Sequence, residues 1–351
     1  MHMKRGLSLR GWLTVVTTVL LVVVVFFAWP EIVRAWRLLD SVNLWILALL
    51  IPVQLFSYYA TGAMIFSYLR AKGNLKDMSR LKMARVALEL NFVNHVLPSG
   101  GAAGFSYLGW ILSKHGVSAG RSTMAQIIRF ALTFVSFLLI LIVAVVLLVI
   151  DHQIGRGTIL ICLGLAALCV GATILGVWLL GSKARLDRFA HWLARIANKV
   201  VGFFTRGRKK NAVKIKTLLG FFTDLHDDFL AIKKDRRILI RPFIWALVAN
   251  LADVALLWIA FWALGVMINP ALLFVAFGVS SLASAVSVTP GGAGVYETIM
   301  IAFLASSAIP ADIAIAGTLI ARITLVLGTI LFGYVFYQLS VAKYGKRASN
   351  G

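Results

Sequence analysis

Residues 288–297 read Val288-Thr289-Pro290-Gly291-Gly292-Ala293-Gly294-Val295-Tyr296-Glu297. This run lies inside an apolar region, Ala271–Ile309, which is too long for one ordinary helix and has a proline and three glycines at its middle. A related run, Val96-Leu97-Pro98-Ser99-Gly100-Gly101-Ala102-Ala103-Gly104, interrupts a second apolar region, Leu81–Leu112. Within a bilayer, such breaks are tolerated only where protein or a water-filled cavity surrounds them. Two glycine-broken segments in matching positions therefore predict the binding site of a transport protein.

The composition indicates an all-α polytopic membrane protein. The 351 residues are 60% hydrophobic and 14% charged, whereas about a quarter of the residues in a soluble domain are charged. The net charge of +22 lies in short stretches beside apolar spans, as in loops that face an anionic leaflet. The expected partner is therefore the bilayer and not nucleic acid. Cys162 and Cys169 share one apolar segment, and we expect them to pack as hydrophobic side chains.

Apolar runs of spanning length predict six full membrane spans within a single membrane domain, residues 1–351. The spans are Gly11–Trp29, Leu44–Leu69, Arg121–Ile150, Thr158–Leu180, Pro242–Leu264 and Ile313–Leu339. The first is expected to be a retained helix, because Ala28-Trp29-Pro30 is not a small-x-small cleavage site. In the second, Pro52 and Gln54 predict a kink or an inward polar face.

Charge placement predicts the orientation. If both broken segments re-enter without crossing, most lysines and arginines share one side, in residues 1–10, 70–85, 114–121, 183–241 and 343–347. The other side keeps Arg34, Arg37 and Arg156. The positive-inside rule then predicts a multi-pass protein of the inner (cytoplasmic) cell membrane with both termini in the cytoplasm.

The same topology makes the two broken units inverted relative to each other. Their spacing agrees, because 31 residues separate Pro98 from Arg129 and 32 separate Pro290 from Arg322. The predicted fold is therefore six full spans plus two broken re-entrant segments in an inverted-repeat arrangement, which is typical of alternating access.

Residues 183–240 predict a cytoplasmic amphipathic hairpin between the two repeats. Apolar residues recur at spacings of three and four from Leu186 to Phe204 and from Ile215 to Ile232, around a basic turn at residues 205–211. Two interpretations stay open: a hairpin lying on anionic lipid, and a hairpin packed on itself or on a second subunit of a homo-oligomer. His226-Asp227-Asp228 falls on the polar face, and we expect solvated surface there and not a metal site.

A proline followed by glycines frees the start of the next half-helix, where N–H donors and about half a positive charge face outward. Glycine also lets an anionic group approach the backbone closely. The alternative is that these glycines only allow close helix packing. The predicted substrate-binding residues are the two boxes with nearby polar side chains: Asn94, Pro98, Gly100, Gly101, Gly104, Arg129, Pro290, Gly291, Gly292, Gly294, Glu297 and Arg322.

Charged side chains inside a membrane cost about 3 kcal/mol each even on the mildest scale, and they are usually functional. Glu89, Asp253 and His95 are predicted coupling groups that exchange partners or take a proton. Asn250 is expected to share a helix face with Asp253. The alternative is that Arg129 and Arg322 only form internal ion pairs with Glu89, Glu297 or Asp253 and so hold the breaks in place.

The 290–297 box, the looser Pro98-Ser99-Gly100-Gly101 box and the arginines that follow them resemble the flippase-like membrane region of the lysylphosphatidylglycerol synthase family. The resemblance covers nearly the whole chain. It implies movement of a phospholipid or related anionic lipid between leaflets. The sequence ends at Gly351 without the soluble aminoacyl-tRNA-dependent domain of the synthases, so the resemblance does not imply lysyltransferase activity here.

The leading hypothesis is a flippase-like transporter that moves an anionic lipid by alternating access, without ATPase activity and without a cofactor. The sequence contains no phosphate-binding P-loop, HExxH or nucleophile elbow, so we expect no enzyme and no metal or catalytic residues. Two alternatives remain: an intramembrane lipid-modifying enzyme or its accessory unit, and a membrane scaffold that recruits a partner through the hairpin.

Overall fold

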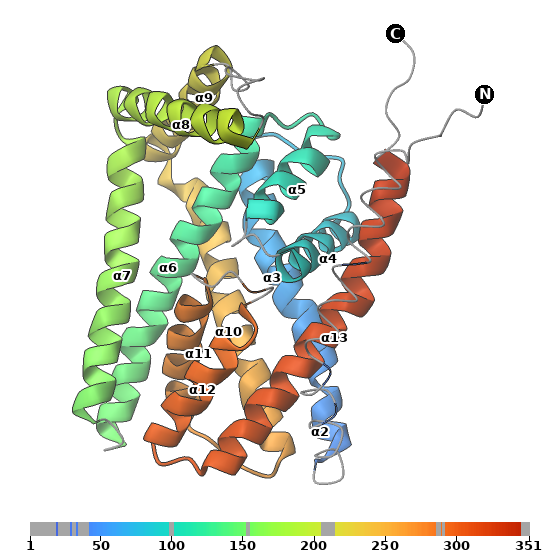
Figure 1. Cartoon of the computed structure of the whole chain (residues 1–351), viewed down its shortest axis with the longest axis vertical. Coiled ribbons are helices and arrows are strands. Elements are labelled where there is room, and N and C mark those ends of the chain that lie inside the picture. The colour runs from blue at the N-terminus through green and yellow to red at the C-terminus, as the bar shows by residue number, and fades with distance from the viewer. Residues whose placement is uncertain are drawn as a thin grey trace.

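Long helices that run the length of the molecule build the structure, which is a computed structural model (Figure 1). It describes residues 42–97, 102–151, 155–204, 215–285 and 292–344, together with Val19, Trp29, Val33 and Thr289. Every regular element in these ranges is helical, which confirms the predicted all-α polytopic class.

Five described stretches are long and apolar enough to cross a membrane. They are α2–α3 (Leu44–Ala48 and Leu50–Ala71), α6 (Ala119–Ile150), α7 (Arg156–Leu180), η2–α10 (Arg236–Leu239 and Ile240–Ala263) and α13 (Ala311–Tyr344). They correspond to the second to sixth predicted spans, and the first, Gly11–Trp29, lies almost wholly outside the described residues. The helix interruption at Leu49 comes three residues before Pro52.

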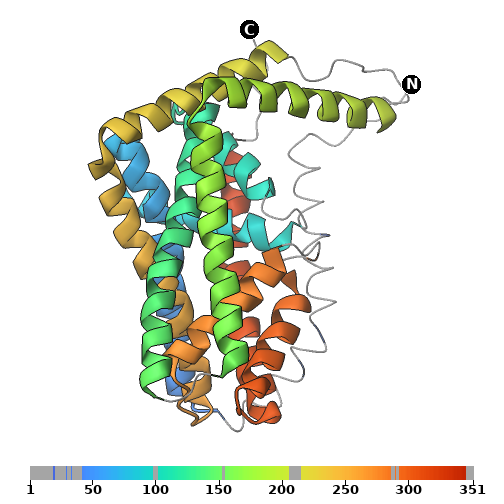
Figure 2. The same ribbon diagram turned by 90° about the vertical axis from the view of Figure 1, so that its left-hand side faces the viewer.

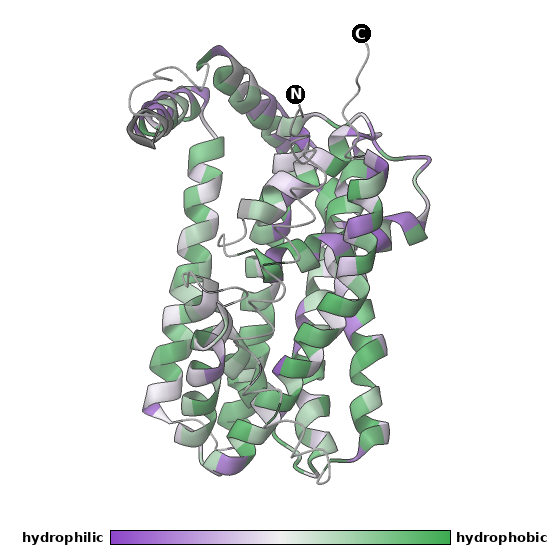
Figure 3. Cartoon of the chain, turned by 45° about the vertical axis from the view of Figure 1, so that its right-hand side comes forward, coloured by the Kyte–Doolittle hydropathy of each residue, from purple (hydrophilic) through white to green (hydrophobic). Residues whose placement is uncertain are grey.

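The outer surface of the bundle is apolar. Side chains of α7 such as Leu160, Leu163 and Leu175 are more than 60% exposed, and α6 and α13 expose similar residues. Figure 3 shows hydrophobic colour along the long helices. Soluble monomers rarely expose apolar patches of this extent, so this surface suits contact with acyl chains.

The two broken segments form two helical hairpins. The first consists of α4 (Arg80–Val96) and α5 (Ala102–Ser113), and the second of α11 (Pro270–Ala285) and α12 (Val295–Ser306). The longest of these helices has 17 residues, or about 26 Å at 1.5 Å per residue. None of the four alone spans a hydrocarbon core of about 30 Å. In Figure 1 the α4–α5 pair lies in the half of the molecule nearer α8 and α9, and the α11–α12 pair lies in the other half.

Two further helices, α8 (Lys183–Phe204) and α9 (Ile215–Lys234), lie across one end of the bundle (Figures 1 and 2). We call this the hairpin end. The two helices pack on each other, and α9 also packs on α6. Part of the apolar face that the sequence predicted is buried, through Leu186, Phe222 and Leu225, whereas Ile196 and Ile215 of the same face are exposed.

Small residues let the spanning helices approach closely. A Cβ atom added to Gly317 of α13 would lie 2.2 Å from the Phe261 ring of α10, and one added to Gly62 of α3 would lie 2.5 Å from Ala87 of α4. Gln54 of α3 points inward as predicted, and its Nε2 donates to the Leu325 carbonyl of α13 at 2.6 Å. Close backbone approach and interhelical hydrogen bonds are how helices associate within membranes.

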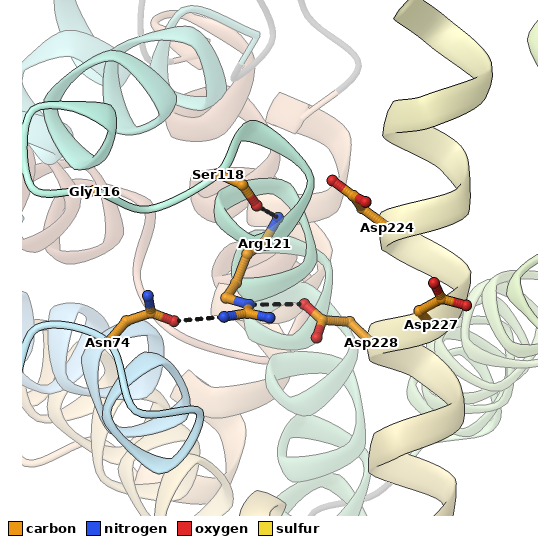
Figure 4. Close-up of a pocket in the computed structure, with 7 residues that line it drawn as sticks. All are labelled: Asn74, Gly116, Ser118, Arg121, Asp224, Asp227 and Asp228. Atoms are coloured by element: carbon orange, nitrogen blue, oxygen red, sulfur yellow. Dashed lines mark hydrogen bonds and ion pairs between the residues drawn. The ribbon is translucent and has the colours of Figure 1, made fainter.

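Asp228 attaches the hairpin to the bundle (Figure 4). It is 6% exposed, with its Oδ1 3.4 Å from Lys72 Nζ and its Oδ2 3.4 Å from Arg121 Nε. Arg121 also donates to Asn74 Oδ1 at 3.0 Å. The expectation of solvated surface at residues 226–228 is therefore wrong for Asp228. It holds for Asp227, which is exposed.

The His226 ring also makes a contact within the protein, because its Nδ1 lies 2.8 Å from the Leu180 carbonyl at the end of α7. The prediction of solvated surface fails at residues 226 and 228 because α9 turns this part of its polar face toward the ends of α6 and α7.

Asp228→Asn is expected to loosen the hairpin, because it removes the charge that faces two cations. A hydrogen bond to a charged group contributes about 1.5 kcal/mol, so amide exchange in α9 should become about tenfold faster. Hydrogen–deuterium exchange mass spectrometry measures this directly. The matched control is Asp227→Asn, which changes the neighbouring exposed carboxylate. Equal exchange in both variants would contradict the attachment.

Candidate functional site

The second break is shaped by two glycines in the left-handed region. Gly292 has φ +73° and Gly294 has φ +84°, a conformation that side chains with a Cβ rarely adopt. A Cβ on Gly292 would also lie 2.3 Å from the Ser284 side chain near the end of α11. The chain therefore folds back against α11 before α12 begins at Val295. Pro290 and Gly291 lie outside the described residues.

Glu297 closes the start of α12. Its Oε2 accepts the backbone N–H of Gly294 at 2.6 Å, and its Oε1 lies 2.7 Å from Arg322 Nε of α13. The two side chains are 6% and 12% exposed. A carboxylate of the chain itself thus occupies the end of the helix dipole, where an anionic ligand would bind. Of the predicted charged groups, the structure brings these two into direct contact.

Asp253 of α10 belongs to the same region. Its Oδ1 accepts from Ser57 Oγ of α3 at 2.5 Å. The Tyr296 ring lies 5.0 Å from the Arg322 guanidinium, and it is close enough to both Asp253 and Glu297 for electrostatic interaction. We call Ser57, Asp253, Tyr296, Glu297 and Arg322 the central polar cluster. It joins helices from both halves of the chain.

Of two further predicted polar residues, Asn250 makes its hydrogen bond away from Asp253, whereas His95 lies near Arg322. Asn250 does not join Asp253, because its Nδ2 donates to Ser136 Oγ at 2.6 Å and so ties α10 to α6. His95 lies close enough to Arg322 for their charges to interact, and its Nδ1 is 2.9 Å from the Asn91 carbonyl. The end of α4 that carries His95 therefore lies near the central polar cluster.

Glu89 lies elsewhere and is fully buried. It accepts from Tyr107 Oη at 2.6 Å and Ser340 Oγ at 2.7 Å, and it pairs with Arg85 Nε at 2.8 Å. These donors come from α5, α13 and α4. Glu89 therefore joins the first broken hairpin to α13, and its predicted coupling role remains a prediction.

Arg129 of α6 contrasts with Arg322. Its Nε is buried and has no hydrogen-bond partner among the described residues, and no ion pair in those ranges includes it. Its guanidinium lies 4.3 Å from the Phe130 ring, which stacks on Phe105 of α5. The proposed internal ion pair therefore forms at Arg322, whereas in the described part of the chain the Arg129 guanidinium lies over the Phe130 ring.

The start of α5 gathers further polar atoms without partners. A Cβ on Gly104 would lie 2.0 Å from Asn94 Oδ1, so the glycine lets α5 begin directly against the end of α4. The Gly104 carbonyl accepts from Gln126 Nε2 at 3.4 Å. Asn94 Oδ1 and Gln126 Oε1 are buried and, within the described ranges, make no hydrogen bond. Pro98, Gly100 and Gly101 lie outside those ranges.

We call Asn94, Gly104, Gln126 and Arg129 the open polar cluster. Sequence reasoning named three of these residues and missed Gln126, although it is a polar residue in an apolar span three positions before Arg129. Ser57 was also missed, because a serine in an apolar helix is common and gives no signal of a site. Buried polar atoms without partners are unusual in native proteins and mark places where a ligand or water can bind.

The fold and this arrangement define a polytopic helical membrane protein with two broken helices next to buried arginines. The chain belongs to the family of the lysylphosphatidylglycerol synthase TM region, whose model matches residues 12–333. It is also similar to a UPF0104 membrane protein of Methanothermobacter thermautotrophicus, with 25% identity over 220 residues. That match covers 62% of this chain and 60% of the archaeal protein.

The direct contact between Glu297 and Arg322 predicts energetic coupling. In a double-mutant cycle with Glu297→Gln and Arg322→Gln, the second substitution should cost about 1–2 kcal/mol less once the first is present. Denaturant titration in mixed micelles measures the four free energies of unfolding.

The control cycle combines Glu297→Gln with Arg129→Gln, which should be additive within about 0.5 kcal/mol because these side chains share no described contact. Additive behaviour in both cycles would contradict the ion pair.

Proposed function

We propose that the protein moves an anionic phospholipid or related lipid between leaflets by alternating access, without ATP hydrolysis and without covalent chemistry on the lipid. The observation that carries this proposal is the difference between the two arginines. Arg322 is neutralised by Glu297, whereas the Nε of Arg129 is buried without a hydrogen-bond partner among the described residues. A phosphate group supplies the negative charge and the acceptor oxygens that Arg129 lacks. Asn94 Oδ1 and Gln126 Oε1 are themselves acceptors, so they suit the hydroxyl or ammonium donors of a lipid head group.

Helix geometry puts the two arginines at similar distances from opposite ends of the bundle. Arg129 lies ten residues after the start of α6, at the hairpin end, and Arg322 lies eleven residues after the start of α13, at the opposite end. At 1.5 Å per residue these distances are about 15 and 16 Å. Because α6 and α13 have 32 and 34 residues and start at opposite ends, the two arginines lie at different depths, one nearer each end of the bundle. In the proposal a head group therefore passes from one arginine to the other as it crosses the bilayer.

In the proposed cycle, the head group first pairs with Arg129. To reach the second half, it replaces the Glu297 carboxylate at Arg322 and at the Gly294 N–H, and Glu297 then turns to another donor or takes a proton. Asp253 and His95, which lie near Arg322, are the groups placed to exchange that proton. A ligand drives such a change only if it binds the two conformations with different affinity.

The hairpin end is proposed to face the cytoplasm. Basic residues are concentrated there, including Arg70, Lys72, Arg121 and the cations of α8 and α9. This placement is what the positive-inside rule requires of an inner-membrane protein. The broken hairpin α4–α5 then re-enters from the cytoplasmic side, and α11–α12 re-enters from the other side.

Arg129→Gln tests the proposal because it separates function from stability. Removing a buried charge without a partner should leave the free energy of unfolding unchanged or raise it. Transport of a fluorescent anionic phospholipid in proteoliposomes should fall about tenfold or more, because a charge-assisted contact is lost. Arg322→Gln should lower both the free energy of unfolding and the rate of lipid transport, since it leaves Glu297 buried without its cation.

The matched control is Arg156→Gln, an exposed cation at the start of α7, which should transport like the wild type. Transport of a zwitterionic lipid serves as the second control. Wild-type transport by Arg129→Gln protein would overturn the proposed site. Turnover of the labelled lipid in detergent, where no leaflets exist, would favour an enzyme instead.

A further inference from the structure

A cavity lies at the hairpin end and shares no residue with either polar cluster. Its volume is about 770 Å³, within the range of about 300–1,000 Å³ that is typical of ligand sites. It lies between the end of α3, the start of α4, η2 and the start of α10. Its charged lining residues are Arg70, Arg80, Arg237, Arg241 and Asp235.

The arginines of this cavity are not neutralised by the protein. Arg80, Arg237 and Arg241 take part in no ion pair within the described ranges. Asp235, the single acidic residue of the lining, accepts the backbone N–H of Arg237 at 3.1 Å and so caps η2. Arg70 donates one Nη2 bond to the Met78 carbonyl, and its Nε is buried without a partner in that part of the chain. Four guanidinium groups around one opening are the usual arrangement for binding phosphate.

The other end of the cavity is apolar and lies deeper. Tyr59 of α3 is eleven residues before Arg70, which places it about 16 Å further along the helix axis. Its ring meets Trp245 of α10 edge to face, with centroids 5.4 Å apart. Ala63, Phe66 and Met83 complete this wall. A free phosphate ion gains nothing from contact with apolar side chains, whereas the acyl chain of a phospholipid is stabilised by packing against them.

We propose that this cavity is a binding site for a phospholipid of the leaflet at the hairpin end, with its phosphate held by the arginines and an acyl chain along Tyr59, Ala63 and Trp245. This site is separate from both polar clusters, and the inference does not depend on the proposed transport function. The shared chemistry is a phosphate anion, and the experiment below distinguishes a lipid from a soluble phosphate.

The test compares two double variants of the full chain that each lose two positive charges. Arg237→Gln with Arg241→Gln removes cavity cations, and Lys233→Gln with Lys234→Gln removes exposed cations at the end of α9 that do not line the cavity. Native mass spectrometry of protein titrated with phosphatidylglycerol gives the affinity. We expect about tenfold weaker binding in the cavity variant and a change below about twofold in the other. Arg80→Gln, on the opposite wall, should weaken binding in the same direction.

Two further measurements make the test decisive. The titrations are repeated with Arg129→Gln present, so that the proposed binding at the open polar cluster is removed and the two proposals fail separately. Inorganic phosphate is added as a competitor and should not displace the lipid at millimolar concentration. Equal losses in both double variants, no loss in the cavity variant, or displacement by inorganic phosphate would each overturn the lipid site.

Discussion

The Glu297 carboxylate makes the second broken helix compatible with a membrane. A helix that begins in the middle of an apolar region exposes N–H donors that no water satisfies. Glu297 accepts the N–H of Gly294 and neutralises Arg322 at the same time, so one side chain balances both a helix terminus and a buried cation. Gly292 and Gly294 adopt positive φ angles in this turn, and the turn brings the Gly294 N–H within hydrogen-bond distance of the Glu297 carboxylate. The contact between Glu297 and Arg322 joins α12 to α13 and so helps to hold the central polar cluster together.

The two halves of the chain differ in how they neutralise charge. A protein that only needed stability would pair both arginines or replace them with apolar residues, because a buried charge without a partner is costly. Instead the described part of the chain pairs Arg322 and leaves Arg129 against Phe130. An arginine over an aromatic ring recovers part of its hydration energy and keeps its hydrogen-bond donors available. This difference fits the proposed alternating access. An anionic ligand could bind Arg129 directly, whereas at Arg322 it would have to displace the Glu297 carboxylate.

The sequence predicted the spans and the breaks because their signals are local. Length, apolarity and a proline followed by glycines are enough to place five described spans and both hairpins close to their observed bounds. Which carboxylate would meet which arginine was not predictable, since Glu89, Asp253 and Glu297 are equivalent in composition and only packing separates them. Asp228 shows the same limit. It lies on the polar face of an amphipathic helix, and only the docking of α9 on α6 buries it.

The placement of Arg121 and Arg129 on one helix connects the hairpin to the proposed site. Arg121 holds Asp228 of α9, and Arg129 follows eight residues later, about 12 Å along the same axis. A continuous α-helix transmits axial displacement with little loss, so a movement of the hairpin moves Arg129 relative to the first break. Gly120 also packs closely on α9, since a Cβ at this position would lie 2.7 Å from the Asp224 side chain, so α6 and α9 are in tight contact here. A displacement of α9 that carries α6 with it would therefore also displace Arg129.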